Sequence, residues 1–336
     1  MNSTVLDEEG TNASYYTILG RYQDELFFCF RGFDGTSLVA VNFRTGNTRT
    51  IALDQVFYIV SEADVFADGK YVCIEQDKKT KEYEVSIYDV TDGKKMSYTI
   101  EDFDRASVPS APEYLEKANV VYVSNPSGEY IIDIDKAKVS DVAVPNNWSG
   151  SLCSAEDDTG SIMAVADNNY ILILNKDGSV ERQISTNGMT PLGMCFHKMG
   201  EKDPMTLYVA YNNGSMYRYD PESGSFTGSS NITAYDRVYD FKAKFSFDDE
   251  NKTLTIRIGE LCDVIETDTW VETICVQNCM GYCRKSDEFY AVTFTDSNEK
   301  YLGYFKHYSL EDLKNKAKET LQGIEPAEDL KSLYGI

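Results

Sequence analysis

The sequence has few histidines, no long apolar run and none of the common nucleotide-binding or hydrolase motifs. His197 and His307 are the two histidines among 336 residues. They fall in different repeats of the pattern described below, so we expect structural roles rather than a catalytic or metal-binding pair. The glycine-rich motifs GxxxxGK[S/T], GxSxG and GxGxxG do not occur. No apolar run reaches the roughly 18 residues of a membrane-spanning helix. The sequence therefore predicts a non-enzymatic protein with no cofactor, no metal and no membrane span.

Cationic residues are also scarce. The chain has 32 Lys and Arg against 55 Asp and Glu, a formal net charge of −23. Such a surface repels a phosphate backbone, so nucleic acid is not an expected partner. The acidity fits a solvated surface, and the alternative is an electrostatic role toward a basic partner.

Eight cysteines occur, and no apolar export signal precedes them in the polar and acidic N-terminal text MNSTVLDEEG. Most lie inside apolar strand-like text, where buried thiols are common. We therefore predict eight reduced thiols and a cytoplasmic protein. Three cysteines follow one another at intervals of four residues: Cys275, Cys279 and Cys283. The sequence that contains them predicts a strand end, a loop and the next strand. Packing is thus favoured there over a zinc site.

Aromatic residues and short alternating runs are abundant, with 24 Tyr and 16 Phe in the chain. The stretch Val65–Lys94 reads as strands separated by turns at Asp68-Gly69 and Asp92-Gly93, which we expect to be two-residue hairpin turns. A polar residue ends the third strand of each repeat, at spacings of 41 to 47 residues: Asn42, Asp89, Asp133, Asn175, Asp220, Glu266 and His307. This period is typical of a β-propeller blade and predicts seven four-stranded antiparallel blades.

The two ends of the chain complete this scheme. The seventh repeat lacks a fourth strand, which the N-terminal segment 3–8 is predicted to supply, so that the propeller spans residues 1–308. The segment 101–119 reads as an inserted surface loop because prolines interrupt it. Residues 309–336 form a predicted helical tail, with a helix over 309–323 whose apolar stripe we expect to pack on the propeller. That stripe consists of Leu310, Leu313, Ala317 and Leu321.

Two parts of the sequence resemble known propellers. The text FADGKYVCIEQDKKTKEYEVSIYDVTDGK resembles the blade pattern of WD-repeat propellers, although no blade has the Trp-Asp pair. The tail YSLEDLKNKAKETLQGIEPAEDLKSLYGI is similar to the ending of propellers at the C-termini of bacterial multidomain signalling and defence proteins. Pro326, Glu328, Tyr334 and Ile336 match that ending, and Leu330 replaces its usual arginine. The resemblance implies a recognition domain that senses a ligand or partner for an effector outside this chain.

Propellers bind through the loops that enter each inner strand and through those that join the second and third strands. Aromatic and cationic residues in such loops are our candidates for a partner-binding site: Arg105, Trp148, Tyr235, Arg237 and Tyr282. Two acidic clusters, Asp157-Asp158 and the segment 248–250, lie at expected turns. We interpret them as solvated turn residues, with a weak calcium site as the alternative.

The sequence thus favours a monomeric sensor or scaffold propeller that binds a protein or peptide. Two alternatives remain open. One is a propeller hydrolase or lyase with its site in the central channel. The other is an extracytoplasmic propeller that binds sugars or peptides.

Overall fold

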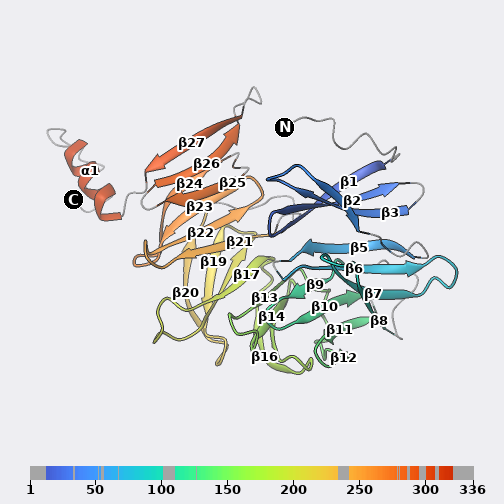
Figure 1. Ribbon diagram of the computed structural model, residues 1–336. Helices are drawn as coiled ribbons and strands as arrows, with labels where there is room; N and C mark the ends of the chain where they lie inside the picture. Colours follow the sequence, from blue (N-terminus) through green and yellow to red (C-terminus); the bar gives the residue numbers. More distant parts are fainter. Residues whose placement is uncertain are drawn as a thin grey trace. The chain divides into compact units, whose positions relative to one another are not determined.

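The computed structural model divides into two compact units, Met1–Gly188 and Met189–Ile336. Figure 1 shows both built almost entirely of β-strands. The structure describes residues 13–32, 35–51, 53, 57–66, 68–100, 110–125, 127–233, 242–277, 279, 281–285, 288–294, 300–306 and 310–320.

The first unit contains one eight-stranded and two four-stranded sheets. The eight-stranded sheet has the order β4-β3-β2-β1-β5-β6-β7-β8 and consists of two antiparallel halves, which meet where β1 pairs in parallel with β5. The strands of the first half are β1 (Ala13–Tyr22), β2 (Glu25–Gly32), β3 (Gly35–Asn42) and β4 (Thr48–Ile51). Those of the second half are β5 (Phe57–Val65), β6 (Lys70–Asp77), β7 (Tyr83–Asp89) and β8 (Lys95–Thr99).

The two four-stranded sheets of this unit follow in chain order. One contains β9 (Glu113–Leu115), β10 (Val120–Asn125), β11 (Gly128–Asp133) and β12 (Lys138–Asp141). The other contains β13 (Cys153–Glu156), β14 (Met163–Ala166), β15 (Tyr170–Leu174) and β16 (Val180–Ser185).

The second unit has two four-stranded sheets, one three-stranded sheet and a helix. Its first sheet contains β17 (Pro191–His197), β18 (Thr206–Tyr211), β19 (Ser215–Tyr219) and β20 (Phe226–Asn231). The next contains β21 (Lys244–Asp248), β22 (Thr253–Ile258), β23 (Leu261–Glu266) and β24 (Val271–Val276). The last elements are β25 (Gly281–Lys285), β26 (Glu288–Phe294), β27 (Lys300–Lys306) and α1 (Leu310–Thr320).

The repeated polar residue of the sequence has a structural role in the turn after the third strand. The Asp89 carboxylate accepts a hydrogen bond from Thr91 N at 2.8 Å, and Gly93 closes the turn at a φ of 74°, donating its N–H to Asp89 O. Asn42, Asp133 and Asp220 accept bonds from their own turns in the same way. Side chains that bond to the backbone two or three residues ahead stabilise turns locally. The period of the sequence therefore corresponds to a turn that recurs after the third strand of each repeat.

The core lies between successive sheets. Along β6, Tyr71 and Cys73 pack toward the β1–β4 half, whereas Val72 and Ile74 pack against β10 and β11. Successive residues of a strand point to opposite faces, so both faces of β6 are buried. Alternating apolar and polar residues, as in Val65–Lys94, are typical of half-buried strands, but β6 is buried on both faces because a sheet covers each side.

Three further details differ from the sequence-based expectations. The segment 101–119 is not entirely loop, because its end contains β9, which pairs with β10. The turn between β7 and β8 spans residues 90–94 rather than two residues. Asp157 is buried rather than solvated, since its carboxylate accepts bonds from Ser161 N and Ile162 N. The sequence did not reveal β9 because a strand of three residues is too short to show an alternating pattern.

The helix is present where the sequence predicts one. Among its described side chains Leu313 is partly buried, while Ala317 is exposed. Docking of the tail on the propeller stays a prediction. Segment 3–8, proposed to complete the last sheet, lies outside the described residues. In the described part of the chain, no helix has the length and apolar character needed to cross a membrane.

Candidate functional site

Trp148 lines a pocket in the first unit. The pocket has a volume of about 610 Å³ and lies beside the turn between β10 and β11 and the connection from β12 to β13. These are the two kinds of loop that the sequence analysis selected for partner binding. Most of its lining residues are small or carry hydroxyl and amide groups, such as Ser110, Ser127 and Asn146. A Trp in such a polar cavity offers an apolar surface among many hydrogen-bonding groups.

Glu129 is the charged residue among those lining this pocket. It is 4% exposed, and its Oε1 accepts hydrogen bonds from Trp148 Nε1 and from Ser124 Oγ, both at 2.8 Å. Its Oε2 is buried and has no hydrogen-bond partner among the described residues. The indole of Trp148 is thus held in place by a buried carboxylate, which Tyr122 also approaches.

One acidic residue lines the pocket and a second lies near it. Burial raises the pKa of the Glu129 carboxyl above its usual value, and the nearby Asp167 raises it further. Asp167 is itself buried and accepts hydrogen bonds from Ser149 N and Tyr170 N. Two acidic groups near one polar cavity favour a ligand that donates hydrogen bonds or carries a positive charge.

The other candidates from the sequence are not brought to this pocket by the described structure. Arg105, Tyr235 and Arg237 lie outside the described residues. Tyr282 is in β25, and its side chain is not described. Trp148 is therefore the candidate whose surroundings are known, and Glu129 is the neighbour that the sequence did not reveal. A glutamate after a turn looks solvated in sequence, and only its burial beneath Trp148 distinguishes it.

The evenly spaced cysteines do not form a cluster of thiols in the described part of the chain. Cys279 is buried and hydrogen-bonds to the Cys262 thiol. Cys275 instead faces Asp263 and Glu272, with their ligand atoms within 4.8 Å of one another. Burial, followed by a hydrogen bond to Asp263, raises the pKa of Cys275 to about 12.

This group of side chains is held by hydrogen bonds. Both carboxylate oxygens of Glu272 accept bonds from Thr233, one from its N–H and one from its hydroxyl. The packing role that the sequence predicts for Cys275 and Cys279 stays a prediction. The Cys283 side chain is not described.

His197 is satisfied within the second unit. Its Nε2 lies 2.8 Å from Asp249 Oδ1, and its ring stacks on Phe247 with centroids 3.8 Å apart. This environment matches the structural role predicted for the residue. His307 lies outside the described residues.

A scan against protein-family models finds no match, and a search of curated proteins finds no similar sequence. Solved structures do match. One is a chain in the crystal structure of the mitotic checkpoint complex, with 10% sequence identity and a TM-score of 0.54. The match covers 92% of this chain and 96% of that one. Another is Sqt1 of Saccharomyces cerevisiae, at 11% identity and a TM-score of 0.49 over 73% of this chain and 68% of that one. The first match, with the antiparallel sheets described above, shows that the chain has a β-propeller fold.

Proposed function

We propose that this chain is a non-enzymatic recognition or scaffold propeller that binds a protein or peptide partner through the Trp148 pocket. The observation that carries the proposal is the hydrogen bond between Trp148 Nε1 and the buried Glu129, at the rim of a cavity of about 610 Å³. Cavities of roughly 300–1,000 Å³ are typical of ligand sites. Tryptophan is among the residues that most often contribute binding energy at protein interfaces.

The chemistry of the pocket favours a basic partner segment. Glu129 lines the pocket, and the buried Asp167 lies close to it. An amine or guanidinium group in the pocket would be attracted by these two acidic side chains. The net charge of −23 acts in the same direction by attracting basic segments to the surface. The similar chain from the mitotic checkpoint complex is part of a protein assembly.

A peptide-display selection on the immobilised protein tests this function. We expect enrichment of peptides that contain Lys or Arg and whose binding is weakened about tenfold or more by Glu129→Gln. Asn146→Lys places a cation at an exposed rim position, so it should weaken the same peptides while leaving the fold intact.

Glu181→Gln, at an exposed position of β16, is the matched control, because it makes the same change away from the pocket and should leave these peptides bound. If no peptide is enriched, or if the enriched peptides bind both pocket variants as tightly as the parent, the pocket is not the recognition site and the proposal fails.

The number of blades, the cellular location, the oligomeric state and the position of the tail are parts of the same proposal. Seven repeats in the sequence and the sheets of the two units support seven blades, with the β1–β4 and β5–β8 halves counted as one blade each. The cytoplasmic location is supported by the cysteines, since the seven whose side chains are described are thiols. The monomeric state, a C-terminal position in a larger signalling or defence protein, and the tail packed on the propeller follow from the sequence features given above.

A further inference from the structure

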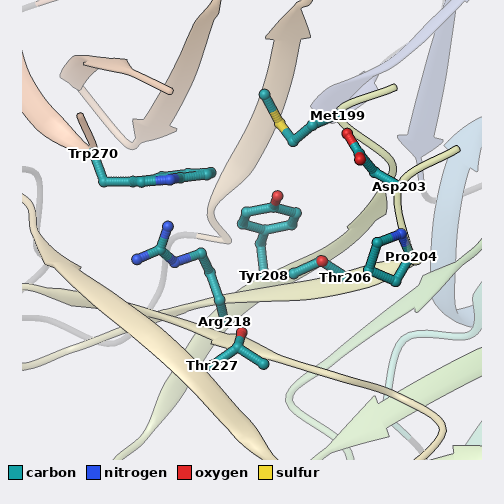
Figure 2. A pocket seen from close by; sticks show the side chains of 8 residues that line it. All are labelled: Met199, Asp203, Pro204, Thr206, Tyr208, Arg218, Thr227 and Trp270. Carbon is teal, nitrogen blue, oxygen red and sulfur yellow. The ribbon is translucent and has the colours of Figure 1, made fainter. Parts of the chain in front are cut away.

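A second pocket, of about 230 Å³, lies within the second unit between its two four-stranded sheets (Figure 2). Its walls come from the connection between β17 and β18, from β18, β19 and β20, and from the turn between β23 and β24. Its lining includes two aromatic rings, one cation and one acid: Tyr208, Trp270, Arg218 and Asp203.

Arg218 is held against aromatic rings rather than against an acid. Its guanidinium carbon lies 4.0 Å from the centroid of the Trp270 ring, and Trp270 in turn stacks on Tyr208 with centroids 5.6 Å apart. Figure 2 shows the guanidinium lying along the face of the indole. Within the described residues Arg218 forms no ion pair, and its buried Nε has no hydrogen-bond partner.

This lack of an acidic partner is unusual in a chain with 55 acidic residues. Burial lowers the pKa of Arg218, which means that the charged guanidinium has lost hydration without a compensating carboxylate. A cation–π contact offsets part of this cost, and no carboxylate of the described residues pairs with the guanidinium.

Gly228 leaves room for the guanidinium beside β20. A Cβ at this position would come 2.4 Å from Arg218 Nη2, so a larger residue would displace the end of the side chain. The register pairs Tyr208, Arg218 and Gly228 across three neighbouring strands, which places them side by side. Trp270 then covers them from the adjacent sheet. The cation is therefore oriented in advance of any ligand.

We propose that this pocket binds a carboxylate group, with Arg218 as the cationic donor and the Trp270 and Tyr208 rings as its walls. The planar guanidinium matches a carboxylate through paired N–H donors. Asp203 lines the same pocket, and the whole chain is strongly acidic, so a singly charged anion is repelled less than a phosphate dianion. The volume fits one small carboxylate or one acidic side chain of a peptide. The proposal is independent of the Trp148 pocket, which lies in the other unit and has the opposite polarity.

The two tryptophans of the chain make a direct measurement possible. In protein labelled with 5-fluorotryptophan, ¹⁹F NMR should give two resonances, which Trp148→Phe assigns. Sodium acetate, titrated at constant ionic strength against sodium chloride, should move the Trp270 resonance in a saturable manner. The Trp148 resonance should stay in place. Phosphate at the same ionic strength should bind more weakly than acetate.

Two substitutions test the role of the guanidinium. Arg218→Gln should weaken acetate binding by about tenfold or more, and Gly228→Ala should weaken it by displacing the side chain. Arg182→Gln, at an exposed position of β16 in the first unit, removes the same charge and should have no effect. Thermal melting of each variant shows whether the fold is kept. If Arg218→Gln unfolds, Arg218→Lys keeps the charge without the planar fork and should still weaken binding.

A blocked glutamate, N-acetylglutamate α-amide, identifies the source of the carboxylate. Tighter binding than acetate indicates an acidic peptide side chain, whereas weaker binding indicates a small free acid. The proposal is overturned if Arg218→Gln, or its replacement Arg218→Lys, leaves the acetate-dependent change in the Trp270 resonance unaltered. It is also overturned if chloride, phosphate and acetate move that resonance equally. Neither result bears on the peptide selection at the Trp148 pocket.

Discussion

At the scale of single residues, Glu129 should make the stability of the protein depend on pH. Its carboxyl pKa is raised above the ordinary 4.5, so the folded protein holds this proton more tightly than the unfolded chain does. The contribution of Glu129 to the free energy of unfolding is therefore largest below about pH 4.5 and is lost as the pH rises through the raised pKa. A tenfold difference in proton affinity between the folded and unfolded chain corresponds to about 1.4 kcal/mol.

Glu129→Gln removes this titration while keeping an oxygen that can accept from Ser124 and Trp148. We expect the variant to be at least as stable as the parent at pH 8, with the difference vanishing toward pH 4.5. Urea unfolding at a series of pH values measures it, and Glu181→Gln, at an exposed position, is the control. A difference that stays constant with pH would contradict a raised pKa at Glu129.

Gly160 should tolerate no side chain. It has a φ of 65°, and a Cβ there would come 2.3 Å from the backbone at Lys117 and Ala118, in the turn between β9 and β10. Gly160→Ala should therefore cost about 1–2 kcal/mol for the left-handed backbone plus about 1–3 kcal/mol for the overlap. Gly188→Ala is the matched control, because Gly188 has a φ of 77° with nothing within 4 Å. Equal shifts of the two unfolding midpoints would show that the close approach is not a constraint.

At the scale of elements, the C-terminal tail gives a further prediction. Helix α1 has 11 residues, and isolated helices shorter than about 12–15 residues are marginal in water, so we propose that packing on the propeller stabilises it. Leu313 is the described apolar side chain of the helix that is partly buried. Each fully buried leucine contributes about 1.5–3 kcal/mol.

Truncation after Tyr308 should therefore lower the melting temperature by several degrees. Lys316→Ala, on the exposed side of α1, should leave it unchanged. If the truncated protein melts within a degree or two of the parent, the tail is a separate linker or a partner-binding segment rather than a part of the fold.

At the scale of the whole molecule, the cysteines test the predicted compartment. The seven described cysteine side chains are thiols, and most of them are buried. We expect all eight cysteines to react when the protein is denatured without reductant and titrated with a thiol reagent. The native protein should react more slowly, because burial limits access. A count below six would indicate disulfides and favour the extracytoplasmic alternative.

The sequence by itself determined the features that depend on neighbouring residues. Alternation and aromatic content predicted most strands. The spacing of residues such as Asp89 predicted the repeat, because each of these side chains forms hydrogen bonds to backbone groups only two or three residues ahead. The short strands β9 and β13 were missed, since three or four residues show no period. The sequence indicated Trp148 as a loop aromatic, but it did not indicate its hydrogen-bond partner Glu129.

Only the tertiary structure decided which side chains meet between sheets. Burial of both faces of β6 depends on a sheet at each side, which no local pattern encodes. The contact between Trp148 and Glu129 joins the β12–β13 connection to β11, and the contact between Arg218 and Trp270 joins two sheets. Both candidate sites lie where segments distant in sequence pack together. Packing there buries Glu129 and part of Arg218, although the residues next to them in sequence suggest that both are exposed.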